Sequence, residues 1–116
     1  MVTFAIDTST PAVGARTLRV RGSIDAASFE ELEAVLRHAF AESMDTVTVD
    51  LGNVDFVSSV GVVVLLDAVL RANEEGIDFT LARVPDHVLS VLDLLSLVER
   101  FRTLCHLEPL ADQPDG

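Results

Sequence analysis

Two adjacent serines, Ser58 and Ser59, stand in front of a very apolar segment, and the fold of that segment constrains the whole chain. Its first part, Val60 to Leu66, is rich in β-branched valines, which suit a buried strand as well as a helix. Length decides between them, because about 14 residues bounded by the serines and by Gly76 fit one helix better than one strand. The run ends at Asp67 and is too short for a bilayer span of about 20 residues.

The rest of the sequence alternates between strand and helix patterns. Residues 2–7 and 16–21 are predicted to pair as a hairpin around a turn at residues 8–15. The later predicted elements are a helix from about Ser28 to Ser43, a strand at 47–51, the helix from Ser59 to about Asn73, a strand around 79–81, a helix opened by Pro85-Asp86 and a last strand at 101–107. This order predicts an α/β fold, a mixed β-sheet with helices packed mainly on one face.

Side-chain periodicity assigns the expected core positions. Ser28 and Glu31 have the spacing of a capping box, and an apolar stripe follows them at helical spacing: Phe29, Leu32, Leu36 and Phe40. The helix after Pro85 is expected to turn Val88, Val91, Leu92 and Leu95 inward. Asp67 is expected on the solvent side of its helix. Cys105 is predicted to be a buried residue of the last strand.

Composition limits the function classes. The chain has 116 residues, of which 49% are hydrophobic, so we expect one domain at residues 1–108 and a mobile polar tail at 109–116. The net charge of −11 disfavours direct binding to nucleic acid. A single cysteine excludes an internal disulfide, and the first 20 residues show no secretory signal, so a cytoplasmic protein with no membrane association is expected. The histidines lack metal-ligand spacing, and neither a metal nor a cofactor is predicted.

The serine pair has two interpretations that residue chemistry alone leaves open. A hydroxyl at a helix start can cap unpaired backbone N–H groups, for about 1 kcal/mol. The same position favours a phosphate, because the helix dipole is positive there. Asp25 is similarly ambiguous, either a solvated turn residue or part of a surface beside the serines.

Three stretches, in order along the chain, resemble the STAS domain family, and within it the single-domain bacterial anti-sigma-factor antagonists. Gly22-Ser-Ile-Asp25 resembles the family's Gly-x-(Leu/Ile)-Asp, and Val49-Asp-Leu-Gly-Asn-Val-Asp-Phe56 resembles its strand and loop. Phe56-Val-Ser-Ser-Val-Gly61 resembles Phe-(hydrophobic)-Asp-Ser-Ser-Gly, the family's phosphorylation loop. The resemblance runs from about Thr17 to Leu104.

The resemblance implies a STAS-like fold and a regulatory function without enzymatic activity. The chain would bind an anti-sigma factor, often a serine kinase of the histidine-kinase-like ATPase type, and thereby release a sigma factor. Alignment on Gly61 makes Ser59 the phosphoacceptor, while the family's preceding Asp falls on Ser58 and its second Ser on Val60. Ser58 is the alternative acceptor. The implied partner surface comprises Asp25, Ser58, Ser59, Val60 and Gly61.

Three other interpretations remain open from the sequence. Loss of the family Asp would suit an adaptor that is never phosphorylated. A pocket with convergent polar groups would favour a STAS domain that senses a small molecule or nucleotide. A histidine within hydrogen-bond reach of Ser58 or Ser59 would favour a serine nucleophile. The sequence names neither the partner nor the oligomeric state.

Overall fold

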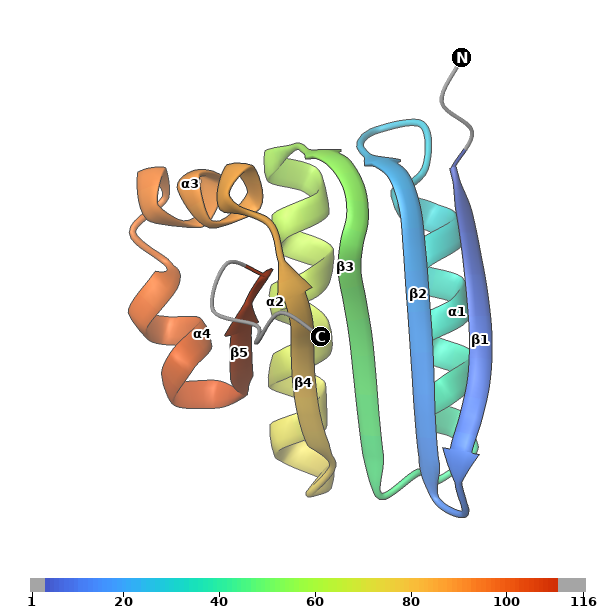
Figure 1. Cartoon of the computed structure of the whole chain (residues 1–116). Helices are drawn as coiled ribbons and strands as arrows, with labels where there is room; N and C mark the ends of the chain where they lie inside the picture. The colour runs from blue at the N-terminus through green and yellow to red at the C-terminus, as the bar shows by residue number, and fades with distance from the viewer. Residues whose placement is uncertain (1–3, 111–116) are drawn as a thin grey trace.

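One five-stranded sheet forms the centre of the computed structural model, which describes residues 4–110 (Figure 1). The strands lie in the sheet in chain order: β1 (Ala5–Ala12), β2 (Ala15–Ile24), β3 (Thr46–Val57), β4 (Asp78–Val84) and β5 (His106–Pro109). β1 pairs with β2 antiparallel, and the other neighbours pair in parallel. The predicted α/β fold with a mixed sheet is confirmed.

Four helices within residues 4–110 connect these strands: α1 (Phe29–Ala41), α2 (Ser59–Glu75), α3 (Asp86–Leu94) and α4 (Val98–Leu104). Figure 1 shows α1 and α2 side by side against one face of the sheet, with α3 and α4 beside β4 and β5. His87 Nε2 lies 2.9 Å from the Val54 carbonyl oxygen and ties α3 to β3. Asn73 donates to the Leu104 carbonyl at 2.6 Å and ties α2 to the end of α4. The helices therefore lie mainly on one face, as predicted.

The core lies between the sheet and the helices, chiefly α1 and α2, and on the strands it follows the alternation expected of half-buried strands. Leu18 and Val20 are buried together on β2, as predicted. The predicted stripe of α1 is buried at Leu32, Leu36 and Phe40 and partly buried at Phe29. Asp67 is exposed on α2, also as predicted. The residues that alternate with the core on β2 and β3 are less buried and polar, for example Arg19, Thr48 and Asp50.

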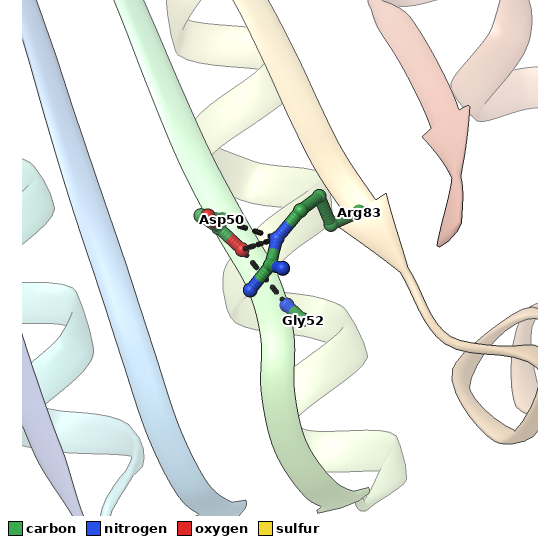
Figure 2. A network of polar contacts seen from close by, with 3 residues as sticks. All are labelled: Asp50, Gly52 and Arg83. Atoms are coloured by element: carbon green, nitrogen blue, oxygen red, sulfur yellow. Dashed lines mark hydrogen bonds and ion pairs between the residues drawn. The ribbon is translucent and has the colours of Figure 1, made fainter. Parts of the chain in front are cut away.

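A three-residue contact on the uncovered face joins β3 to β4 (Figure 2). Arg83 Nε donates to the two carboxylate oxygens of Asp50 at 3.1 and 3.2 Å, and Asp50 Oδ1 also accepts from the Gly52 N–H at 2.9 Å. Arg83 has φ 51° at an irregularity of the β4 register, and this turns its side chain away from the core. A Cβ on residue 52 would overlap the guanidinium. Asp50 is the last residue of β3 that pairs with β4, so this contact connects the two strands beyond the paired region.

The amino-terminal hairpin is longer than predicted. The turn predicted at residues 8–15 is wrong, because β1 continues through Thr8 and Ser9, which pair with Leu18 and Thr17. Only two residues, Val13 and Gly14, lie between the strands, and Gly14 has φ 80°. A polar segment with a proline suggested a loop, but an edge strand tolerates both because one of its sides is not paired. Residues 2 and 3 of the predicted first strand lie outside the described part of the chain.

Ser28 is the N-cap position of α1, as predicted, but the side-chain bonds of the predicted capping box with Glu31 are wrong. Ser28 precedes α1 but makes no side-chain cap, and its hydroxyl points back to the turn. The reciprocal bonds lie one turn earlier: Asp25 Oδ1 accepts from the Ala27 N–H at 3.0 Å, and Ser28 Oγ accepts from the Asp25 N–H at 3.0 Å. Asp25 therefore caps the turn that leads into α1, and in that turn Ser28 makes the returning bond that was expected from Glu31.

The carboxyl-terminal third differs most from the prediction. The strand predicted at 101–107 is wrong, because residues 98–104 form α4 and only His106–Pro109 form β5. Phe101 is fully buried from the helix, and partly buried Val98 and Leu104 stand three residues to either side. This spacing is helical, but one turn of pattern is too short to identify from the sequence.

Two side chains of this region are placed differently as a result. Leu95 follows α3 and is 43% exposed, so its predicted inward orientation is wrong, whereas Val88 and Leu92 are buried and Val91 is partly buried. Cys105 follows α4 instead of lying in a strand, and it is only partly buried. Burial raises the pKa of the Cys105 thiol to about 11.

The predicted domain boundary at residue 108 stays a prediction. β5 ends at Pro109, and residues 111–116, most of the predicted tail, lie outside the described part. No helix among the described residues combines the length and apolar character that a bilayer crossing demands.

Candidate functional site

The two serines lie where β3 ends and α2 begins, as predicted. Ser58 has extended backbone geometry and is the N-cap of α2, and its Oγ accepts from the Gly61 N–H at 3.3 Å. Residues 60–66 are helical, and α2 ends at Gly76, which has left-handed geometry. The prediction that the apolar segment is one helix stopped at Gly76 is confirmed.

Ser59 is the first residue of α2, and its environment differs from that of Ser58. Ser59 is exposed, whereas Ser58 is partly buried. Within residues 4–110 the Ser59 hydroxyl has no hydrogen-bond partner, while the Ser58 hydroxyl serves the cap. Ser59 lies at the positive end of a 17-residue helix, where unpaired N–H groups favour an added negative charge. Ser59 is therefore the chemically available hydroxyl of the pair.

Gly61 brings the start of α2 against the end of β2. A Cβ at this position would stand 2.7 Å from Ile24 Cγ2 and 2.9 Å from the Ile24 carbonyl oxygen, closer than packed atoms allow. The Ser58 N–H donates to the same carbonyl at 2.9 Å. Ile24 also pairs with Val57 across the parallel strands. Because Gly61 has no side chain, α2 can approach the end of β2 closely, and the serines therefore lie next to that strand end.

Asp25 follows directly after β2 and lies next to this junction. Its Oδ1 accepts from the Ala27 N–H, and its carbonyl oxygen accepts from the N–H groups of Ser28 and Phe29 at 3.1 and 2.9 Å. Oδ2 has no hydrogen bond in the described part of the chain. Asp25 therefore both caps the entrance to α1 and keeps one carboxylate oxygen for another group.

Exposed apolar side chains flank the serines. Phe56 is 51% exposed at the end of β3, and Val60 and Val63 are 39% and 55% exposed on the first turns of α2. Val60 was predicted as part of the surface, but Phe56 and Val63 were not. The signal for Val63 is its position three residues after Val60, which places both on one helical face. We call Asp25, the two serines and these exposed apolar side chains the serine surface, because all of them lie at the adjacent ends of β2 and β3 or on the first turns of α2.

The geometry offers little support for catalysis or ligand sensing at the serines. No hydrogen bond between a histidine and either serine is found among residues 4–110, and His87 Nε2 lies against the Val54 carbonyl oxygen instead. Among residues 4–110, no group of three or more His, Cys, Asp or Glu could hold a metal ion. A groove between α1 and α2, floored by Leu36, Phe40, Val64 and Ala68, has a volume of about 260 Å³. That volume is below the range of about 300–1,000 Å³ usual for a small-molecule site, and the serines do not line the groove.

Comparison with known proteins identifies the family. The family model described as "Mlab, STAS domain" matches residues 10–105. The chain belongs to the STAS domain family. No curated protein sequence matches the chain.

Solved structures agree with this fold. An anti-sigma factor antagonist from Mycobacterium paratuberculosis is 23% identical, with a TM-score of 0.74 over 94% of this chain and 86% of that chain. A putative anti-sigma factor antagonist from Thermotoga maritima is 12% identical, with a TM-score of 0.76 over 89% and 85%. The phosphorylated form of the Bacillus cell fate determinant SpoIIAA is 16% identical, with a TM-score of 0.68 over 89% and 90%. At these identities the similarity shows the fold.

Proposed function

We propose that the chain is an anti-sigma-factor antagonist that acts in the cytoplasm and binds an anti-sigma factor through the serine surface. Binding would free a sigma factor, and phosphorylation of Ser59 by a partner kinase would end the binding. The chain itself supplies a surface and an acceptor hydroxyl, and the chemistry belongs to the partner. The names of several structural relatives support the class of partner.

One observation carries the proposal: Ser59 is exposed, with no hydrogen-bond partner among the described residues, on a surface edged by Phe56, Val60 and Val63. An exposed apolar patch beside a modifiable hydroxyl suits a regulated protein interface. Ser58 is the weaker candidate acceptor, because its hydroxyl is occupied by the Gly61 N–H.

The proposed switch follows from the charge that a phosphate adds. A phosphate carries nearly two negative charges, which the positive end of α2 would tolerate within this chain. An apolar partner face in contact with Val60 and Val63 could not solvate the same charge, and an unpaired charge at an interface costs about 2–5 kcal/mol. The fold would change little, while the affinity would fall at least tenfold.

The test begins with capture of the chain from its native lysate and identification of the bound proteins. The recovered anti-sigma factor is then purified and titrated calorimetrically with wild type, Ser59→Asp and Ser59→Ala. Ser59→Asp should bind at least tenfold more weakly at unchanged thermal stability, and Ser59→Ala should bind like wild type. Mass spectrometry after incubation with the partner and ATP should locate the phosphate on Ser59.

A second outcome would favour the unphosphorylated adaptor. Ser58 stands where the family motif has an Asp, and that carboxylate is absent from the loop. If Ser59→Asp and Ser59→Ala bind equally well and neither serine gains a phosphate, the chain binds its partner constitutively. If no anti-sigma factor is recovered, the proposed function itself is wrong.

A further inference from the structure

We propose that Ser28 is a positioning residue for the Asp25 carboxylate, which it holds ready for a basic side chain of the partner. The inference rests on the proposed function, since that function assigns Asp25 to the partner surface. Ser28 is 7% exposed and is the one buried polar side chain found within residues 4–110. Ser28 cannot contact the partner extensively itself, so its effect on binding would pass through the turn that it holds, which carries Asp25.

The hydrogen bonds of Ser28 all lead back into the turn that carries Asp25. Its hydroxyl donates to the Ser23 carbonyl at 2.6 Å and accepts from the Asp25 N–H at 3.0 Å. Its backbone N–H donates to the Asp25 carbonyl at 3.1 Å. The Asp25 Oδ1 atom lies 3.3 Å from the same hydroxyl. The single hydroxyl proton goes to the Ser23 carbonyl, so Ser28 fixes the backbone of Asp25 directly, and that backbone in turn places the carboxylate against the Ala27 N–H.

Three consecutive carbonyl groups anchor this turn to different parts of the molecule. The Ser23 carbonyl accepts from the Ser28 hydroxyl, the Ile24 carbonyl from the Ser58 N–H, and the Asp25 carbonyl from the start of α1. Asp25 is therefore held in a fixed relation to the start of α2 as well as to α1. Loosening the turn at Ser28 would free Asp25 while leaving the Ser58 contact in place.

A fixed carboxylate binds a cation at lower entropic cost than a mobile one. Oδ1 is held by the Ala27 N–H, and Oδ2 has no hydrogen bond in the described part of the chain. One oxygen therefore orients the group and the other is available for an arginine or lysine of the partner. Fixing one side chain before binding is worth about two- to tenfold in affinity.

The test uses Asp25→Asn, Ser28→Ala, Ser28→Thr and the double variant Asp25→Asn/Ser28→Ala. Asn caps a helix as well as Asp, so Asp25→Asn removes the charge and keeps the turn. Calorimetry with the purified anti-sigma factor should show about tenfold or greater loss for Asp25→Asn and roughly two- to tenfold for Ser28→Ala. The double variant should bind no more weakly than Asp25→Asn, and Ser28→Thr should bind like wild type.

Thr103→Val is the matched control, because Thr103 also donates its hydroxyl to a backbone carbonyl, that of Glu99 at 2.9 Å, but lies on α4. It should leave the affinity unchanged. Additive losses in the double variant, or Ser28→Ala binding like wild type, would overturn the inference.

A measurement on the free chain separates this inference from the proposed function. Three-bond NMR couplings should report one χ1 rotamer for Asp25 in wild type and Ser28→Thr, and rotamer averaging in Ser28→Ala. A single rotamer in Ser28→Ala would overturn the positioning role even if the anti-sigma factor binds. Wild type that binds no anti-sigma factor would instead refute the proposed function and the role of Asp25 toward the partner, while the couplings still decide whether Ser28 fixes the carboxylate.

Discussion

At the scale of single residues, neighbouring serines of the same chemistry lie in different environments. Ser58 precedes α2, and its hydroxyl oxygen accepts a hydrogen bond from the Gly61 N–H, whereas Ser59 lies in the first turn and is exposed. The backbone geometry produces this difference, because only the residue just before a helix can direct its side chain back to the first N–H groups. Ser58 thus has a structural role, and the regulatory role that we propose falls to Ser59.

Stability measurements should separate these two roles. Ser58→Ala should lower the free energy of unfolding by about 0.5–1 kcal/mol, since the cap bond of 3.3 Å is long. Ser58→Asp should retain the stability of wild type, because Asp caps equally well. Ser59→Ala should change it by less than about 0.5 kcal/mol. Urea unfolding of the three variants checks this order, and a larger loss for Ser59→Ala than for Ser58→Ala would contradict it.

At the scale of elements, the serine surface depends on the close approach of α2 to β2. Gly61 permits that approach at Ile24, and the Ile24 carbonyl in turn holds the Ser58 N–H. The turn after β2 carries Asp25 to the same junction. Two strand ends, paired in parallel at Ile24 and Val57, therefore bring together residues more than 30 positions apart in the sequence.

Gly61→Ala should destabilise the fold by about 1–3 kcal/mol, although alanine is the better helix former. The added methyl would press on Ile24 and Val57, so the start of α2 would move outward. Hydrogen exchange of the Ser58 amide should become faster along with the loss of stability measured in urea.

Gly76→Ala is the matched control for this prediction. Its methyl would have open space around it, and its cost of about 1–2 kcal/mol arises from φ +70° alone. Hydrogen exchange at Ser58 should stay close to that of wild type after correction for global stability. Equal effects of the two glycine variants on the Ser58 amide would argue against the close-packing role of Gly61.

At the scale of the whole molecule, charge is the dominant feature. The net charge is −11, and all of the basic residues are arginines. Several arginines pair with acidic neighbours, such as Arg16 with Glu42 at 2.8 Å, and this ion pair lowers the pKa of the Glu42 carboxyl. Most acidic side chains remain without such a pair among the described residues, so the folded chain repels itself at neutral pH.

Salt should therefore stabilise the protein at neutral pH. Raising sodium chloride from about 20 mM to about 200 mM shortens the Debye length about threefold. The repulsion between acidic side chains is then screened, so Tm should rise by a few degrees at pH 7. At a pH near the sequence pI of 4.4 the same increase in salt should have a smaller effect, because the net charge is then close to zero. Scanning calorimetry at both pH values checks the prediction, and a Tm that falls with salt at pH 7 would contradict it.

Local patterns in the sequence determined the class of fold and the location of the serines. Alternation of apolar residues predicted the strands, helical spacing predicted the face of α1, and the length of the segment before Gly76 predicted α2 despite its valines. These features depend on side chains a few residues apart, and the structure confirms them. The same local logic failed where the pattern was short, at α4, and where an edge strand looked like a loop, at residues 8–12.

Tertiary structure decided which groups meet and which role each one takes. The reciprocal bonds predicted between Ser28 and Glu31 are made by Asp25 and Ser28 instead, because the strand end at Ile24 fixes where the chain can turn. Val63 became exposed while Val62 became buried because α1 and the sheet cover only part of α2. Such outcomes depend on contacts between segments distant in the chain, which no local pattern encodes. The sequence alone therefore located the serine loop, and the packing of α2 against β2 determined what surrounds it.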